Sequence, residues 1–437
     1  MLGGSFMKKK FLQYIFPSMC SFLLTGIYSV IDGIFVGNAI GDNGLAAINI
    51  VWPLIAPMAA LGTGIGMGTS VLMSLNLGAG KDENAKRAEG TGITMLLLAG
   101  LMLFGVLFFF GEPLLKLLGA DGEVLTFGMD YLHYCLAGCF IQVFATGTLP
   151  IMRNLGASFF AMFAMTAGCC TNIFLDWLFI FQLRLGLKGA AVATVCGQLV
   201  TLLFCLYFHL KKEHRIPISY LKPDHYWKSI IKIGISPFGL TYLPAVTILF
   251  MNLQTLKYGG TEAVSAYAVL AYVLSFLELV IQGISDGSQP LLSYDCGKKD
   301  YRSLRTYVRW TFLLAFSFGI VGGTFIYLFR DVIPVIYGTS KATAMVIAQA
   351  APAFGIVMLM YGFTKSTVSY LYATNRTTLS SIMVYGEVVL TITFIFVLPL
   401  FLGLNGVWYT MPTVQLILVI VGIVFRLHTQ KKLSANA

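Results

Sequence analysis

The sequence predicts an all-α integral membrane protein in which twelve transmembrane helices form two parallel six-helix repeats. Apolar residues make up 57% of the 437 residues and charged residues only 11%, whereas soluble domains carry roughly 25% charged residues. In addition, a five-residue sequence motif occurs twice with one substitution. Leu185-Gly-Leu-Lys-Gly189 returns 217 residues later as Leu402-Gly-Leu-Asn-Gly406, each time between two long apolar runs.

The apolar runs divide into two sets of six. Runs of about 20 or more residues, each long enough for a ~30 Å hydrocarbon core, begin near residues 11, 45, 90, 127, 157 and 189, and again near 232, 263, 310, 344, 379 and 405. A second repeat, at a spacing of 219 residues, relates Ser74 and Gly78 to Ser293 and Gly297. Because six is even, the second set starts from the same side as the first, which predicts parallel repeats. We expect an N-terminal lobe at 1–210, a cytoplasmic linker at 211–230 and a C-terminal lobe at 231–437.

The distribution of positive charge predicts the orientation. Most of the 29 Lys and Arg residues fall in alternate connections between the runs, starting with Lys8–Lys10. This bias predicts that both termini are cytoplasmic in a multi-pass protein of the cell membrane. The net charge of +10 is then explained by topology and by contact with anionic membrane lipids, and no nucleic-acid partner is expected. The intervening connections hold only Lys116, Arg184, Lys188, Lys257, Arg330 and Lys341.

Acidic residues inside the apolar runs are the strongest functional signal. Each costs about 2.5 to 3.5 kcal/mol at mid-bilayer unless it is protonated, paired or hydrated. Individually they could be polar contacts between helices, but as a group they favour a function. They are Asp32, Asp176, Glu278, Asp286 and Glu387.

Two of these acids share a depth with other polar residues. Asp32 and Asp176 lie about five residues before the outer ends of spans 1 and 5, and Thr194 lies about six residues past the outer start of span 6, which places all three roughly 7 to 9 Å below the helix ends. Asn172 lies four residues before Asp176, on the same helix face. We expect these four oxygen-bearing side chains to form one coupling site for a hard monovalent cation, sodium if the protein is sodium-coupled, or for a shared proton. Nothing in the set suggests zinc or iron.

The C-terminal half lacks this set and carries most of the 21 tyrosines. Some should form interfacial belts, and others could stack on a cationic or aromatic ligand. We therefore expect the C-terminal lobe to contact substrate. The residues expected to do so are Glu278, Gln282, Asp286, Tyr361 and Tyr370.

Three further features have a structural and a functional interpretation. Lys365, inside span 10, either extends to the nearer interface or is a counter-ion for Glu278, Asp286 or Glu387. Arg153 and Asn154 are expected to cap a helix or contact lipid headgroups. The Gly62–Gly68 stretch, with glycine at every second position, lies inside a span with no strand before it, so close helix packing or local unwinding is favoured over a nucleotide loop.

The residues of the coupling set resemble those of the multidrug and toxic compound extrusion (MATE) transporters, and the resemblance covers essentially the whole chain. It is carried by Asp32-Gly-Ile-Phe-Val-Gly37, by Asn172-Ile-Phe-Leu-Asp176 and by the segment from Gly186 to Thr194. The resemblance implies two six-helix lobes around a central cavity and substrate efflux driven by sodium or proton entry. It also implies that Asp32, Asn172, Asp176 and Thr194 hold the cation, as in the branch whose acids lie in the N-terminal lobe.

The expected function is a secondary active antiporter that exports amphipathic, often cationic organic compounds. The alternative is a flippase for lipid-linked saccharides, although such proteins tend to add spans and to line the cavity with arginines. We expect no enzymatic activity. ATP hydrolysis would need a Gly-Lys-Ser/Thr loop, which the sequence lacks, and an intramembrane protease would need a nucleophile and a base embedded in the spans. No cofactor is expected apart from the coupling ion, and the functional unit is expected to be a monomer with small organic molecules as partners.

Overall fold

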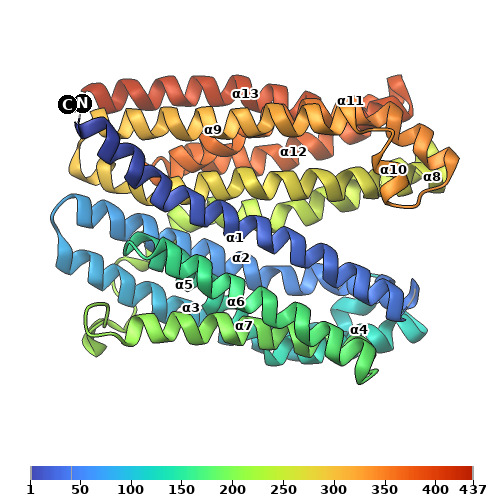
Figure 1. Cartoon of the computed structure of the whole chain (residues 1–437), viewed down its shortest axis with the longest axis horizontal. Helices are drawn as coiled ribbons and strands as arrows, with labels where there is room; N and C mark the ends of the chain where they lie inside the picture. Colours follow the sequence, from blue (N-terminus) through green and yellow to red (C-terminus); the bar gives the residue numbers. More distant parts are fainter. Residues whose placement is uncertain (1, 41, 436–437) are drawn as a thin grey trace. The chain divides into compact units, whose positions relative to one another are not determined.

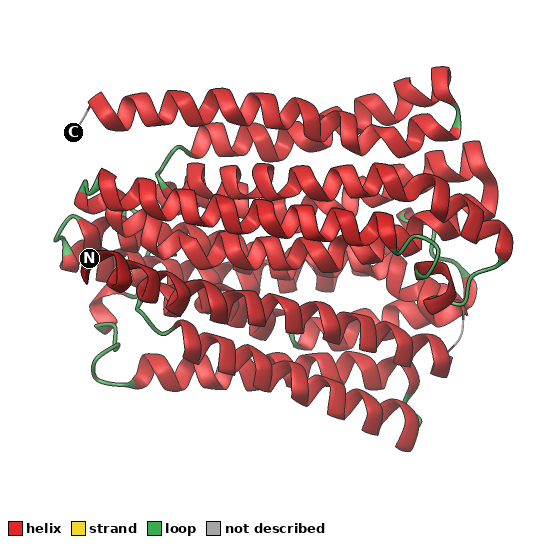
Figure 2. Cartoon of the chain, turned by 45° about the horizontal axis from the view of Figure 1, so that its top comes forward, coloured by secondary structure: helices red, strands yellow, loops and turns green. Residues whose placement is uncertain are grey.

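The computed structural model describes residues 2–40 and 42–435, and their side chains apart from those of 2–4, 33, 36–40, 42–47, 49 and 434–435. All regular structure in the described residues is helical (Figure 2). The main helices, which Figure 1 labels, are α1 Leu2–Ile40, α2 Asp42–Gly78, α3 Asp82–Leu117, α4 Gly122–Ala137, α5 Cys139–Asn154, α6 Ser158–Asp176, α7 Gly186–Leu210, α8 Trp227–Lys298, α9 Tyr301–Leu328, α10 Ile333–Ile336, α11 Lys341–Ala373, α12 Thr377–Leu402 and α13 Leu404–Ala435. A short π-helix, η1 Trp177–Gln182, follows α6, and a 3₁₀ turn, η2 Ile218–Tyr220, precedes α8.

The helices form two compact units. Unit 1 contains Met1–Leu23 and Leu243–Ala437, and unit 2 contains Leu24–Tyr242. Both changes of unit fall inside helices, in α1 and α8. The predicted division of the chain into two lobes joined by a linker at 211–230 stays a prediction.

The number of membrane spans agrees with the sequence pattern. Ten helices of the described part are long and apolar enough to cross a membrane, and the bent pair α4–α5 makes an eleventh span. Helix α8 has 72 residues, about 108 Å at 1.5 Å per residue, which is too long for one crossing. Dividing α8 at its break gives twelve spans, and the prediction of an all-α, multi-pass membrane protein is confirmed.

A glycine lies at each of the two breaks. Within α8 only Gly260 leaves helical geometry, with φ 68° and ψ −164°, a region that residues with a Cβ avoid. This break separates the spans expected to begin near 232 and 263. Between α4 and α5 the axis bends by 55° at Gly138, where a Cβ would lie 2.4 Å from a side-chain carbon of Val195. The absence of a Cβ at Gly138 therefore lets α7 pass close to this helix pair.

The alternating glycines of α2 allow close helix packing on two faces. A Cβ on Gly66 would lie 2.3 Å from the carbonyl oxygen of Gly147 in α5. A Cβ on Gly68 would lie 2.3 Å from the carbonyl oxygen of Ile230 in the first arm of α8. The chain stays helical throughout 62–68, so close packing, and not local unwinding, explains the motif.

Gly66→Ala is expected to lower the free energy of unfolding by about 1 to 3 kcal/mol, because the new methyl group collides with backbone that cannot rotate away. The measurement is thermal or denaturant unfolding of the purified protein in detergent. Gly105→Ala, on α3, is the matched control, because a Cβ there meets no atom within 4 Å; it should leave stability unchanged or raise it by less than about 1 kcal/mol. Equal stability of the two variants would contradict the close packing of α2 and α5.

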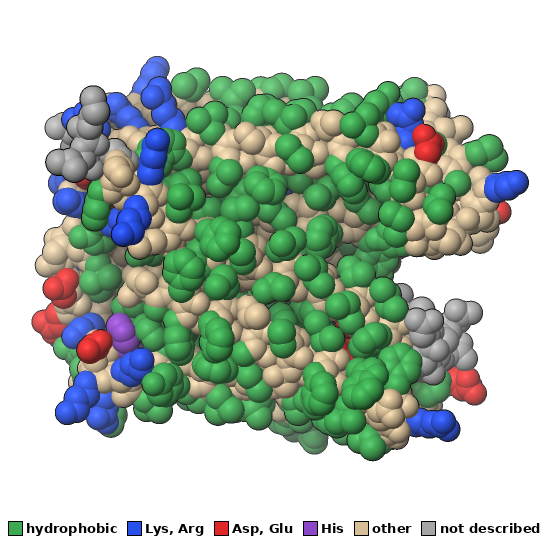
Figure 3. All heavy atoms as spheres, in the orientation of Figure 1, with side chains coloured by type: hydrophobic (Ala, Val, Ile, Leu, Met, Phe, Trp, Pro, Cys, Tyr) green, Lys and Arg blue, Asp and Glu red, His purple; other side chains and the backbone are tan. Residues whose placement is uncertain are grey.

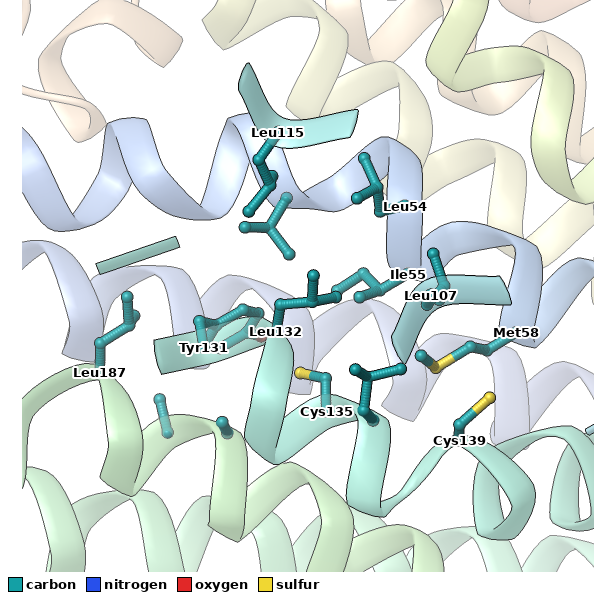
Figure 4. Close-up of a cluster of buried hydrophobic side chains, with 14 of the residues drawn as sticks. Leu54, Ile55, Met58, Leu107, Leu115, Tyr131, Leu132, Cys135, Cys139 and Leu187 are labelled. Carbon is teal, nitrogen blue, oxygen red and sulfur yellow. The ribbon is translucent and has the colours of Figure 1, made fainter. Parts of the chain in front are cut away.

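A cluster of apolar side chains forms the core of unit 2 (Figure 4). It joins α2, α3, α4, α5 and α7, and its centre includes Met58, Tyr131, Leu132 and Cys135. All eight cysteines of the chain are free thiols. Cys135 and Cys139 are buried in this cluster, where they act as small apolar residues.

The surface carries charge at the helix ends. In Figure 3 a broad band of hydrophobic side chains covers the middle of the helices of each unit, and most Lys and Arg side chains lie near the helix ends. In unit 1 the start of α9 and the end of α13 share one such end (Figure 1). Asp300 begins α9 by accepting a hydrogen bond from the Ser303 amide at 3.1 Å, and this bond lowers the pKa of the Asp300 carboxyl.

Candidate cation-coupling site and polar clusters

Unit 2 brings the residues of the expected coupling site together from three helices. Asp32 lies on α1, Asn172 and Asp176 on α6, and Thr194 on α7. The Nδ2 atom of Asn172 donates to Oγ1 of Thr194 at 3.5 Å. A Cβ on Gly197 of α7 would lie 2.9 Å from the Asn172 Cβ, so a glycine at this position lets α6 and α7 approach closely enough for that contact.

The end of α6 gives Asp176 an unusual backbone setting. Asp176 is the last α-helical residue before the π-helix η1, and π-helical turns occur frequently at functional sites. Its side chain is completely buried. The carboxylates of Asp176 and Asp32 are close enough to interact electrostatically.

Four oxygen atoms of this site receive no hydrogen bond from the described residues. Within the described part of the chain, both carboxylate oxygens of Asp176, Oδ1 of Asn172 and Oδ1 of Asp32 are buried and accept no hydrogen bond. A buried anion without a partner is unstable, and a positively charged species that binds oxygen would stabilise this arrangement. A sodium ion or a proton fits these oxygen ligands. Zinc is held by three or more Cys, His or acidic side chains, and this site has only two acids.

Two tyrosines border the site, and the sequence analysis did not identify them. The phenols of Tyr28 and Tyr131 both interact electrostatically with Asp32. Tyr28 precedes Asp32 by four residues and therefore shares its helix face, a spacing that was readable in the sequence. Tyr131 lies on α4 in the apolar core of unit 2 (Figure 4), and only the packing reveals its interaction with Asp32.

Unit 1 distributes the five expected substrate residues over three places. Glu278 and Tyr361 flank Lys365, Gln282 and Asp286 form a second cluster, and Tyr370 lines a separate cavity between α9 and α13. Their shared role in binding substrate stays a proposal.

Lys365 is the centre of a buried ionic network. Its Nζ atom lies 2.8 Å from Oε1 of Glu278 and 3.8 Å from Oε2 of Glu387, and 4.8 Å from the ring centre of Tyr361. The Lys365 side chain is only 5% exposed. The interpretation in which this lysine extends to the membrane interface is therefore wrong, because two carboxylates hold the ammonium group inside the unit.

The network continues through neutral side chains. Gln415 on α13 donates to Glu387 Oε1 at 2.7 Å and accepts a hydrogen bond from Thr364 at 2.9 Å. Helices α8, α11, α12 and α13 are therefore tied together by one set of polar contacts. With two carboxylates and one ammonium group, the network carries one excess negative charge when all three groups are ionised.

Asp286 belongs to a second cluster. Its Oδ1 atom accepts hydrogen bonds from Gln282 at 2.8 Å and from the hydroxyl of Tyr372 at 2.9 Å. Asp286 is 4% exposed, so its charge is stabilised by donors supplied within the unit. Tyr372, which the sequence analysis had not assigned to substrate, is its second donor.

Arg153 and Asn154, which were expected either to cap a helix or to contact lipid headgroups, lie in the last turn of α5. Both are buried, and Asn154 forms hydrogen bonds with the hydroxyls of Ser70 and Ser74 on α2. The expectation of a lipid-headgroup contact is wrong for Asn154, because the α2–α5 packing encloses it. Unit 1 repeats the contact at the spacing of 219, where Ser293 donates to the carbonyl oxygen of Ala373 at 2.9 Å.

One buried acid was missed by the sequence analysis. Glu89 on α3 is 4% exposed, and its Oε1 atom lies 3.6 Å from Nε2 of His209 on α7. The sequence placed Glu89 at the start of span 3, where an acid is unremarkable. Helix α3 in fact begins at Asp82, so Glu89 lies two turns inside it.

Comparison with known proteins gives one consistent result. Residues 17–178 and 241–400 match the family model MatE. The multidrug export protein MepA of Staphylococcus saprophyticus is 26% identical over 417 residues, which cover 92% of this chain and 90% of that protein. MepA of Staphylococcus haemolyticus is 27% identical over 407 residues, covering 92% and 89%.

Solved structures have the same fold. The outward-facing conformation of a multidrug resistance MATE family transporter of the MOP superfamily matches with a TM-score of 0.89 and 25% identity, over 98% of this chain and 96% of that chain. A MATE protein in complex with MaL6 matches with a TM-score of 0.91 and 24% identity, over 98% and 97%. The two segments matched by the family model make up well over half of the sequence, and the chain is therefore a MATE family transporter and not an enzyme.

Proposed function

We propose that this protein is a secondary active antiporter that exports amphipathic, often cationic organic compounds in exchange for a sodium ion or a proton bound between Asp32 and Asp176. The observation that carries the cation half is the set of buried oxygens on Asp32, Asn172 and Asp176 that accept no hydrogen bond within the described chain. The export half is supported by relatives named multidrug export proteins.

The site can couple ion entry to a conformational change because its charge depends on occupancy. Without a cation, the two ionised carboxylates of Asp32 and Asp176 repel one another; one bound monovalent cation lowers the net charge of the site from −2 to −1. A ligand shifts a conformational equilibrium only as far as it binds one state better than the other. The packing of α1, α6 and α7 around these residues is therefore the element that cation binding would bias.

The distribution of charge supports an orientation in the membrane, and the composition of the coupling site supports a monomeric functional unit. We place both termini in the cytoplasm and the protein in the cell membrane, because the basic residues are concentrated in alternate connections. A monomer is sufficient for the proposed reaction, since the residues of the coupling site come from a single unit of one chain.

Transport into vesicles tests the proposal directly. Purified protein in liposomes, loaded with a fluorescent organic cation, should export it when a sodium or proton gradient is imposed and should retain it without a gradient. Export under a gradient of one ion, but not under a gradient of the other, identifies the coupling ion. Movement of a lipid-linked saccharide across the bilayer, with no export of dyes under either gradient, would overturn the proposal in favour of a flippase.

The acids of unit 1 should discriminate substrates by charge. Asp286→Asn and Glu278→Gln are each expected to slow the export of cationic dyes about tenfold, the value of roughly 1.5 kcal/mol for one charge-assisted contact, with little effect on neutral dyes. Initial rates with a matched cationic and neutral pair provide the measurement. Glu262→Gln, an exposed acid of the same unit, serves as the control. Equal losses for both dyes would show that these acids stabilise the fold and do not recognise charge.

A further inference from the structure

A cavity of about 970 Å³ opens between the start of α9 and the end of α13 in unit 1, with Tyr370 of α11 also in its wall. None of its lining residues is acidic. Three of the basic lining residues, Arg302, Arg305 and Arg309, follow one another at spacings of three and four on α9 and therefore share a helix face. Arg426 and Lys431 face the cavity from α13. We propose that this cavity binds the phosphate-bearing headgroup of an anionic lipid.

The guanidinium group of Arg426 is held in place by aromatic rings. It lies 4.4 Å from the ring centre of Phe312 and 5.6 Å from that of Phe363. Stacking of this kind orients the group and leaves the N–H donors at its edge available for the oxygen atoms of a phosphate. In the described part of the chain no carboxylate forms an ion pair with Arg426.

Three other cations of the cavity also have no acidic partner in the described part of the chain. Arg302, Arg309 and Lys431 are exposed and form no ion pair with a carboxylate among the described residues. The acid closest in sequence, Asp300, does not line the cavity and caps α9 through Ser303. Like charges gathered in one cavity repel one another, and a bound anion removes this repulsion.

The repeat shows that the fold itself does not require this basic cavity. Helix α9 begins at Tyr301, 219 residues after α3 begins at Asp82, and the two repeat spacings, 219 and 217, place Val308 at the position of Glu89 and Arg426 at that of His209. In unit 2 those positions hold the Glu89–His209 pair, in contact across α3 and α7. In unit 1 the acid is absent, the base is an arginine, and a cavity remains.

Apolar surface beside the cations favours a lipid over a free anion. The cavity wall includes Leu304 and Leu427. One turn beyond Arg309 on α9, Leu313 is 61% exposed, and on α13 Val424 is 57% exposed. A phosphate group at the cations with acyl chains along these side chains matches the geometry of a basic pocket between transmembrane helices on the cytoplasmic side, whereas free phosphate would use only the cations.

Lipid titration of the purified protein in detergent tests this site, with phosphatidylglycerol as the probe and native mass spectrometry as the readout. The wild type should bind it saturably, and Arg309→Gln/Lys431→Gln should bind it roughly 30-fold more weakly, since each basic residue near an anionic headgroup contributes about fivefold. The single change Lys431→Gln should weaken binding about fivefold, and it provides a second measurement if the double variant is poorly folded. Lys212→Gln/Arg215→Gln, exposed residues of the connection before α8, removes the same charge elsewhere and should bind within about twofold of the wild type.

Two further arms distinguish the source of the phosphate. Phosphatidylcholine should not be retained, and inorganic phosphate at the same concentration should not displace phosphatidylglycerol. Displacement by inorganic phosphate would overturn the proposal in favour of a free-anion site. Equal losses in Arg309→Gln/Lys431→Gln and in Lys212→Gln/Arg215→Gln would overturn it in favour of unspecific attraction to a basic surface.

Discussion

Asp176→Asn is expected to abolish gradient-driven export while leaving the protein folded, and Asp32→Asn should do the same. Each change removes one of the two negative charges that face the bound cation. Loss of one member of a buried charge pair costs about 3 kcal/mol or more, which corresponds to roughly 100-fold or more in affinity for the ion. Ion-driven dye export from liposomes measures the effect on transport, and calorimetric sodium titration measures the effect on binding.

The unfolding temperature of the Asp176→Asn variant distinguishes a role of Asp176 in coupling from a role in stabilising the fold. The oxygens of Asp176 accept no hydrogen bond within the described chain, so a neutral amide should leave the unfolding temperature in sodium-free buffer unchanged or higher. Asp130→Asn is the control, because Asp130 is a partly exposed acid of the same unit whose ion pair with Lys188 spans 3.2 Å; export should continue. Full ion-driven export by both Asp32→Asn and Asp176→Asn would contradict the proposed site.

The same site predicts a dependence on pH. Sodium and protons compete for the same carboxylate oxygens, so sodium affinity should fall as the pH is lowered. In Asp176→Asn this dependence should become shallower, because one of the two competing groups no longer binds a proton. A sodium affinity that does not change with pH in the wild type would show that protons and sodium do not share these oxygens.

Lys365→Met should produce the largest loss of stability in unit 1. The change leaves Glu278 and Glu387 without their shared ammonium group, and removal of one partner from a buried ion pair costs about 3 to 5 kcal/mol. Because the two glutamate side chains are 22% and 21% exposed, the lower end of that range is expected. Thermal unfolding in detergent, compared with the wild type, is the measurement.

Removal of the charges together tests the explanation. Lys365→Met combined with Glu278→Gln and Glu387→Gln should recover most of the lost stability, because no unpaired charge then remains in the network. Lys188→Met serves as the surface control. Its ion pair with Asp130 is 49% and 38% exposed, so it should cost less than about 1 kcal/mol. A triple variant no more stable than Lys365→Met alone would show that Lys365 acts through packing and not through charge.

The membrane fold was readable from the sequence because its cause is local. A run of apolar residues long enough to cross a bilayer must be helical there, since no water is present to satisfy an open backbone. The break at Gly260 falls between the spans expected to begin near 232 and 263, whereas the bend at Gly138 falls inside the span expected to begin near 127 and was not predicted. The residues proposed for coupling could be grouped from the sequence for a related reason, because Asp32, Asp176 and Thr194 lie at similar distances from helix ends, and distance along a helix is proportional to residue number.

Contacts between side chains far apart in the sequence were decided only by the tertiary structure. The helix pattern places Lys365 inside a span but does not say which acid faces it; the packing of four helices selects Glu278 and Glu387 and leaves Asp286 to Tyr372. In the same way, Asn154 is turned toward α2 and not toward lipid. Helical periodicity determines how deep a residue lies and which residues share its face, whereas the partner across an interface depends on the rotation of each helix and on where glycines permit close approach.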